Sequence, residues 1–137
     1  MPFEDEPGPY FEPDEELDRL AHAVIGAAIE VHRRLGPGLD EESYESAMAI
    51  EFRLRAIPFA RQVLVDVCYK GEKVGVRRID FVVGGRLLVE LKAIDALAKV
   101  HYAQVPTYLK LTGLTLGLLI NFNVAVLKDG IKRVICA

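Results

Sequence analysis

The sequence is poor in the residues that build thiolate metal sites and disulfide frameworks, and it has no long apolar run. Its two cysteines, Cys68 and Cys136, are too few and too far apart for a zinc site, so reduced thiols are expected. The most apolar stretch, residues 114–127, is interrupted by Asn121 and Asn123 and is too short to span a bilayer. The N-terminus also lacks the basic and apolar regions of a signal peptide. These absences predict a cytoplasmic protein without a membrane segment.

Positive charge is missing from the first sixteen residues, which hold seven of the 20 acidic residues and no Lys or Arg. The remainder of the chain therefore carries 17 basic residues against 13 acidic ones, although the net charge of the whole chain is -3. We expect residues 1–13, which include four prolines, to form an acidic flexible tail, and residues 14–137 to form one domain. A mildly basic body permits a polyanionic substrate without requiring one.

The hydrophobic periodicity changes from helical to strand-like and back along the chain. Apolar residues at helical spacing predict helices over residues 14–35, 40–55 and 94–111, the last kinked or interrupted at Pro106. Period-two patterns predict strands over residues 61–69, 74–83, 86–92, 115–122 and 125–134, the first three forming an antiparallel meander. The resulting order α-α-β-β-β-α-β-β predicts an α/β protein of the α+β type, in which helices pack on a mixed sheet.

Three charged residues stand where a hydrophobic strand has no structural need for them. Asp80 lies inside Ile-Asp-Phe-Val-Val, and Glu90 and Lys92 end Leu-Leu-Val-Glu-Leu-Lys. Burying an ionised carboxylate without a partner costs several kcal/mol, so such residues are usually paired or bound to a metal. Because side chains alternate along a strand, Glu90 and Lys92 share one face, and a tight turn at Gly84-Gly85 would bring Asp80 close to them.

These three groups suit a divalent-metal site for phosphodiester hydrolysis. Mg²⁺ prefers oxygen ligands and keeps several waters, so Asp80, Glu90 and the carbonyl of Leu91 are candidate ligands for Mg²⁺ or Mn²⁺. Lys92 would orient the attacking water or stabilise negative charge on the phosphate. The structural alternative is a buried ion pair, either Glu90 with Lys92 or Asp80 with Arg78, that only holds the sheet together. Arg78 is also a candidate contact for substrate phosphate.

The predicted third helix carries polar residues at the spacing of a buried face. His101, Gln104 and Tyr108 share this stripe with Leu97 and Leu111. Gln104 and Tyr108 are positioned to orient a catalytic lysine or contact a phosphate, and His101 is a candidate substrate-binding residue. The alternative is a stripe at the rim of the core, with Tyr108 as an amphipathic filler.

A third carboxylate is available at the start of the second helix. The segment Gly36-Pro37-Gly38-Leu39-Asp40-Glu41 can be interpreted as a helix stop, a loop and a new helix whose acids favour its positive N-terminus. In the functional interpretation, Glu41 adds a carboxylate to the metal site.

This segment resembles the defining motif of the GxxExxY family, because Leu35-Gly36-Pro37 is followed by Gly38-x-x-Glu41-x-x-Tyr44. That family is placed in the PD-(D/E)xK nuclease superfamily, and the resemblance extends from about residue 17 to 134. It implies a restriction-endonuclease-like core, a mixed sheet flanked by helices. By matching position it implies that Glu41 is the first-helix acid of the superfamily.

The same resemblance assigns the other motifs. Asp80 corresponds to the second-strand acid, Glu90-Leu91-Lys92 to the (D/E)xK element, and Gln104-x-x-x-Tyr108 to the helix motif of an exonuclease-like branch. Ile79 stands where the name of the superfamily has proline, a position that varies within it. Four motifs in the right order are more specific than any one of them.

The leading hypothesis is therefore a Mg²⁺- or Mn²⁺-dependent nuclease that acts on DNA or RNA. The alternative is a catalytically inactive nucleic-acid-binding or protein-interaction module on the same fold, because the chain is small and has no recognisable DNA-reading element. A homodimer through the last two strands or the first helix is a further expectation, supported only by apolar faces.

Overall fold

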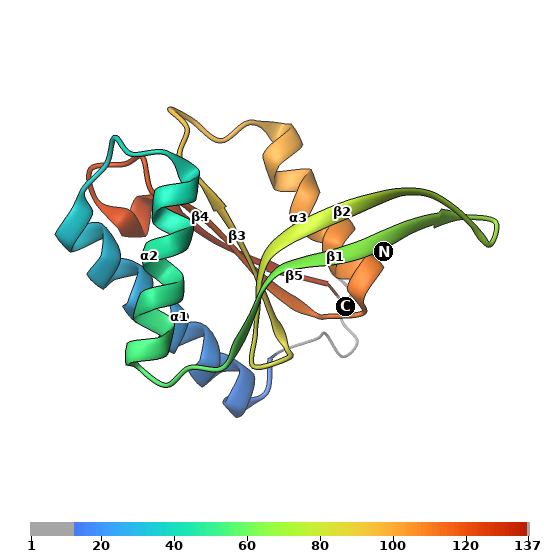
Figure 1. Cartoon of the computed structure of the whole chain (residues 1–137), viewed down its shortest axis with the longest axis horizontal. Coiled ribbons are helices and arrows are strands. Elements are labelled where there is room, and N and C mark those ends of the chain that lie inside the picture. Colours follow the sequence, from blue (N-terminus) through green and yellow to red (C-terminus); the bar gives the residue numbers. More distant parts are fainter. Residues whose placement is uncertain (1–12, 137) are drawn as a thin grey trace, which may run out of the picture.

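The computed structural model describes residues 13–136, so all of the predicted tail except Pro13 lies outside the described residues. Within that range the chain forms a mixed arrangement of helices and strands (Figure 1). In order these are α1 (Glu15–Leu35), α2 (Glu41–Leu54), β1 (Phe59–Tyr69), β2 (Glu72–Val83), β3 (Leu87–Lys92), α3 (Lys99–Thr112), β4 (Leu116–Asn121), the 3-10 helix η1 (Leu127–Gly130) and β5 (Ile131–Ile135). No helix in this range is both long and apolar enough to cross a membrane.

The first two helices begin at aspartates whose side chains cap them. An oxygen of Asp14 accepts a hydrogen bond from the amide of Leu17 at 2.8 Å, and Asp40 accepts one from the amide of Ser43 at 2.9 Å. Each bond satisfies one of the amides that a helix N-terminus leaves without an intrahelical partner. Helix α1 ends at Gly36, whose φ of 71° is a conformation that glycine adopts without steric cost.

The five strands form one sheet in the order β1-β2-β3-β4-β5. The β1–β2, β2–β3 and β4–β5 pairs are antiparallel, which confirms the predicted meander, whereas β3 and β4 are parallel. A parallel pair requires a long crossover connection, and here α3 supplies it.

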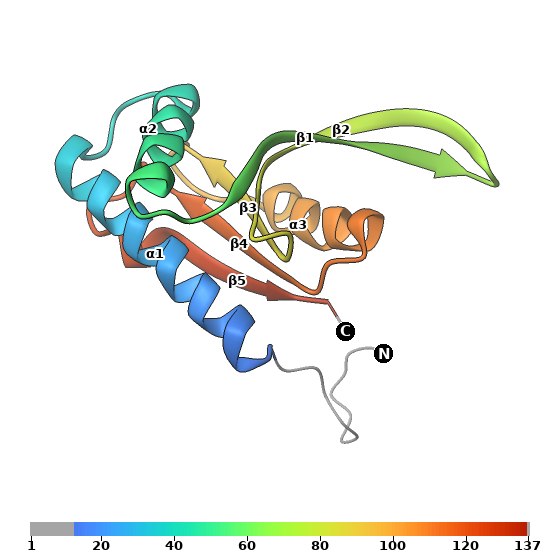
Figure 2. The same cartoon turned by 60° about the horizontal axis from the view of Figure 1, so that its bottom comes forward.

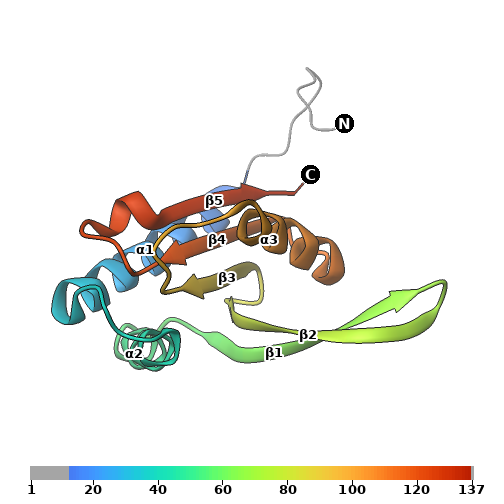
Figure 3. The same cartoon turned by 90° about the horizontal axis from the view of Figure 1, so that it is seen from above.

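Helices cover both faces of the sheet, as Figures 2 and 3 show. On one face α1 and α2 bury a cluster that includes Phe52, Phe81 and Leu118, and on the other α3 packs against Leu88 and Leu119. Every residue of β4 is buried, because a strand covered on both faces has no solvent side. This is the predicted α+β architecture of helices on a mixed sheet.

Two predicted boundaries were wrong. The third helix begins at Lys99 rather than near residue 94, so Leu97 precedes it, and the helix runs through Pro106 without interruption. The last strand covers only Ile131–Ile135, and η1 occupies part of the segment predicted as strand.

Candidate active site

The loop before α2 is held by Tyr44, which is fully buried. Its hydroxyl donates a hydrogen bond to the carbonyl of Gly36 at 2.5 Å and accepts one from the amide of Leu39 at 3.2 Å. Its ring stacks on Phe122 with the centroids 4.5 Å apart. These contacts fix the first turn of α2 and therefore the position of Glu41. The tyrosine of the Gly-x-x-Glu-x-x-Tyr motif is thus a positioning residue.

The β1–β2 pair changes faces at Gln62 and Asp80. Side chains four residues apart in a strand should share a face, yet Phe59 packs with the α1 and α2 cluster and Val63 with the α3 cluster. At the point of change Gln62 has a φ of 55°, which is uncommon for a residue with a side chain, and no Gln62–Asp80 pair exists in the ladder. Asp80 therefore lies at a local break in the sheet and not inside a regular strand.

Asp80 and Glu90 are joined by reciprocal hydrogen bonds. The ladder between β2 and β3 has three pairs and ends at Phe81 and Val89. Beyond it, the Glu90 carboxylate accepts a hydrogen bond from the amide of Asp80 at 2.9 Å, and the Asp80 carboxylate accepts one from the amide of Leu91 at 2.8 Å. The two acids thus replace backbone pairing where the strands separate, and they lie close together, as the sequence predicts.

Both acids are only 5% exposed, and this burial sets their titration. Burial first, and then the charges of Glu41 and Glu45, raise the pKa of Asp80 to about 6, although the hydrogen bond from the Leu91 amide lowers it. Burial, and next the charge of Asp80, raise the pKa of Glu90 to about 8. Lys92 acts in the opposite direction on both groups. The site therefore holds more negative charge than its own surroundings stabilise.

The structure does not contain the ion pairs that the structural interpretation requires. Among residues 13–136 no basic nitrogen forms an ion pair within 4.0 Å of the carboxylate of Asp80 or Glu90. Lys92 and Arg78 lie near enough to influence Glu41, whose own pKa is raised by partial burial of its carboxylate. Buried acids without a cation partner are expensive for the fold, which favours a functional origin.

Helix α3 brings Tyr108 within electrostatic range of the two acids. Tyr108 is 7% exposed, and its pKa is raised by burial first and by the charge of Glu90 next. One turn earlier, the side-chain carbonyl oxygen of Gln104 is buried and has no hydrogen-bond partner among the described residues. The side chain of His101 bonds within its own helix start, because its Nδ1 accepts a hydrogen bond from the amide of Ala98 at 2.8 Å. The predicted stripe therefore faces the site through Tyr108, while His101 caps its own helix.

Glu45 is a component of the site region that the sequence analysis missed. It is 3% exposed, and its carboxylate accepts hydrogen bonds from Nε of Arg61 at 2.7 Å and from the side-chain nitrogen of Gln62 at 2.9 Å. It therefore ties α2 to the strand at the break opposite Asp80, and its charge raises the pKa of that residue. The signal available in the sequence was its spacing, one helical turn after Glu41, without any indication of its partners.

The donor set suits a hard divalent cation held by few protein ligands. Within residues 13–136 no three His, Cys, Asp or Glu side chains are grouped closely enough to form a complete metal cage. Mg²⁺ is commonly bound through one or two carboxylates with the remaining positions left to water and substrate phosphate. Asp80 and Glu90, both buried and poorly neutralised, fit that pattern, and the Leu91 carbonyl lies between Glu90 and Lys92 in sequence.

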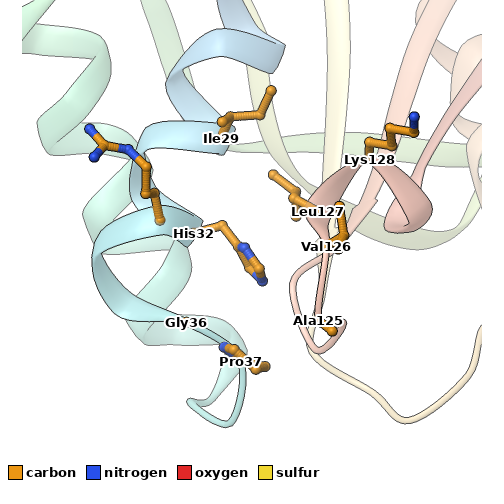
Figure 4. Close-up of a pocket in the computed structure, with 9 residues that line it drawn as sticks. Ile29, His32, Gly36, Pro37, Ala125, Val126, Leu127 and Lys128 are labelled. Carbon is orange, nitrogen blue, oxygen red and sulfur yellow. The ribbon is translucent and has the colours of Figure 1, made fainter.

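A shallow depression elsewhere on the molecule does not belong to this site. It lies between the end of α1 and the loop before η1, and Figure 4 shows Ile29, His32 and Leu127 among its lining residues. His32 is hydrogen-bonded there to the carbonyl of Val124, with Nε2 and oxygen 2.8 Å apart. Because His32 is only 8% exposed and is held by this hydrogen bond, we assign it a packing role, and none of the site acids lines the depression.

Comparison with known proteins supplies one family assignment. No curated protein and no solved structure matches the chain. The sequence profile of the PD-(D/E)XK nuclease superfamily matches residues 18–134, a range that contains every candidate site residue and all the elements described above except the beginning of α1 and the end of β5. The chain therefore belongs to the PD-(D/E)XK nuclease superfamily.

Proposed function

We propose that the protein is a metal-dependent nuclease that hydrolyses phosphodiester bonds of nucleic acids, and that it is a GxxExxY-type member of its superfamily. The observation that carries this proposal is the pair of buried carboxylates, Asp80 and Glu90, at the point where β2 and β3 separate. Lys92 follows on the same strand as Glu90, and Tyr108, on the facing helix α3, lies within electrostatic range of both acids.

Asp80 and Glu90 would hold Mg²⁺ or Mn²⁺, with the Leu91 carbonyl as a further ligand and Glu41 assisting from the start of α2. When bound, the cation supplies charge stabilisation for the phosphate and a water of lowered pKa. Asp80 and Glu90 are buried on adjoining strands, so their orientation is fixed before substrate arrives.

The remaining side chains act on the substrate and on one another. Lys92 stabilises the negative charge that develops on the phosphate or orients the attacking water, and it lies near Glu41. The unpartnered oxygen of Gln104 is available to accept a hydrogen bond from the lysine ammonium. Arg78, exposed on β2 near Glu41, is the candidate contact for a phosphate of the substrate.

The test is a cleavage assay on single-stranded and double-stranded DNA and RNA with Mg²⁺, with Mn²⁺ and with EDTA. We expect cleavage only with metal, and we expect Lys92→Ala to lower the single-turnover rate by a factor on the order of 100 or more, the usual effect of removing one charge-stabilising donor. Lys99→Ala is the matched control, because Lys99 is an exposed lysine at the start of α3.

Asp80→Asn should abolish cleavage while circular dichroism shows an unchanged fold. Equal cleavage by wild type and Lys92→Ala would contradict the assignment of Lys92. If no substrate is cut with either metal, although nucleic acid is bound in EDTA, the proposal fails in favour of a binding module on the same fold.

A further inference from the structure

The strands β1 and β2 continue beyond the sheet as a two-stranded ribbon, which we call the arm and define as residues 63–79. Figures 1 and 3 show it extending past α3, away from the rest of the molecule. No residue from 64 to 78 is buried, and several apolar side chains on it are largely exposed, with Leu64 at 68% and Val74 at 64%. The arm therefore contributes little to the core, and burial does not account for it.

The arm is an antiparallel hairpin. Its strands are paired almost to the end, and the turn residues Lys70 and Gly71 have φ values of 50° and 84°. Two consecutive positive φ values are typical of the type I′ turn, whose twist matches that of antiparallel strands. At its base Val63 and Val65 pack with the α3 cluster. A ribbon of two strands is marginal by itself, so this anchoring gives it a fixed direction.

The direction of the arm is set by the strand that holds Asp80. Its last residue, Ile79, directly precedes Asp80. The charge of Arg78 acts on Glu41 and opposes in part the rise in the Glu41 pKa that burial causes. With roughly 3.3 Å per strand residue, Lys73 lies about 23 Å along β2 from Asp80. A nucleic acid that is bound at Asp80 and Glu90 and follows β2 therefore runs along the arm.

The charge of the arm suits such a polymer. Its ionisable residues include four basic side chains (Lys70, Lys73, Arg77 and Arg78) and two acidic ones (Asp66 and Glu72), a net charge of +2 in a chain whose total is -3. Lys73 and Asp66 are paired at 3.3 Å, but both are 60% exposed and open to exchange their contacts. Basic side chains that neutralise phosphates provide the main, salt-dependent part of nucleic-acid affinity.

The side chains of the arm favour a duplex over a single strand. Single-stranded nucleic acid is usually held by aromatic side chains on which bases stack, and Tyr69 is the one aromatic residue of the arm. A two-stranded β-ribbon fits the major groove of B-form DNA, whereas the major groove of A-form RNA is too narrow for side chains to enter.

We propose that the arm is a binding surface for double-stranded DNA on one side of the scissile bond, with Lys70 and Lys73 contacting its phosphates. The choice of occupant rests on the proposed nuclease function. The arm contributes to binding affinity and not to catalysis, because the proposed catalytic side chains Asp80, Glu90 and Lys92 lie outside residues 63–79.

The test uses a double variant that carries both Lys70→Asn and Lys73→Gln, and it compares this variant with wild type and with a matched control. Asn is tolerated at the positive φ of residue 70, and both changes remove charge without adding bulk. In the control, Lys128 of η1 and Lys132 of β5 are both replaced by Gln, which also removes two positive charges. These residues lie at the opposite edge of the sheet from β1. Binding to a duplex of about 20 base pairs, which at ~3.4 Å per base pair spans the site and the arm, is measured by fluorescence anisotropy in EDTA.

We expect the arm variant to bind the duplex about 10-fold to 60-fold more weakly near 0.1 M salt, and the slope of log K against log salt to fall by about 1.8, as the loss of two phosphate contacts requires. The control should bind like wild type. At saturating duplex the single-turnover cleavage rate of the arm variant should equal that of wild type.

Equal duplex affinities of wild type and the arm variant would overturn the proposal, as would the absence of duplex binding by wild type. Single-stranded DNA that binds as tightly, with the same loss in the arm variant, would overturn the choice of a duplex. Arm-dependent binding of a duplex that is never cut with metal would support the arm and refute the nuclease, so the two failures are distinguishable.

Discussion

Replacing Glu90 by glutamine should stabilise the metal-free protein at neutral and alkaline pH. Gln has the size of Glu, and its side-chain oxygen can still accept the hydrogen bond from the amide of Asp80, but Gln carries no charge. The pKa of Glu90 rises from the ordinary 4.5 to about 8 in the folded protein, mainly because the carboxyl group is buried. The folded state therefore binds a proton more tightly than the unfolded chain does.

The sign of the pH dependence follows from this difference. Between the unfolded pKa of 4.5 and the folded pKa of about 8, the folded protein holds more protons, so its free energy of unfolding falls as pH rises. The loss is at most about 1.4 kcal/mol per pH unit for one group, and across this window it amounts to several kcal/mol. Asp80 also lowers the free energy of unfolding as pH rises, between its unfolded pKa of 3.8 and its folded pKa of about 6.

The assay is urea denaturation in EDTA at several pH values. At about pH 4 Glu90→Gln and wild type should be nearly equal in stability, since both side chains are neutral, and at about pH 9 the variant should be several kcal/mol more stable. Glu72→Gln, at an exposed position where β2 begins, is the control and should show no such gain. A variant that is less stable than wild type by the same amount at every pH would refute the reasoning, because Glu90 would then be a structural acceptor.

Two further predictions concern the residues that position the acids. Tyr44→Phe should destabilise the fold by about 1–2 kcal/mol in urea denaturation, because the buried hydroxyl makes two hydrogen bonds to the preceding loop; an unchanged midpoint would argue against its positioning role. Gln62→Gly should keep the break opposite Asp80 and much of the cleavage rate, whereas Gln62→Val should lose both stability and cleavage, because a β-branched residue adopts a φ of 55° only at high cost. Equal cleavage rates of the two variants would contradict this account.

The order of elements could be predicted because its signals are local. Asp14 and Asp40 cap the helices that follow them, and Gly36 and Gly71 mark a helix end and a hairpin turn. The approach of Asp80 to Glu90 was also predictable, since a short turn between two strands brings those positions opposite one another.

The errors arise from contacts between residues far apart in the sequence. Ile94 follows the helical spacing of the segment before α3, yet its amide and carbonyl are both bound by the buried side chain of Asn121, at 3.1 and 2.9 Å. That side chain replaces the hydrogen bonds of a helical turn, and α3 starts at Lys99.

The role of Glu45 was hidden for a similar reason. Its partners are Arg61 and Gln62, which it meets only because the strand reverses its faces at Gln62. A period-two pattern assumes regular alternation and cannot indicate such a reversal.

The claim on which this account depends most is that Asp80 and Glu90 hold a divalent cation. Isothermal titration calorimetry of Mn²⁺ into wild type and Asp80→Asn, without nucleic acid, tests it directly. We expect saturable Mn²⁺ binding to wild type, and we expect Asp80→Asn to abolish this binding while the fold is retained. Binding of equal strength to both proteins, or no binding to wild type, would contradict it.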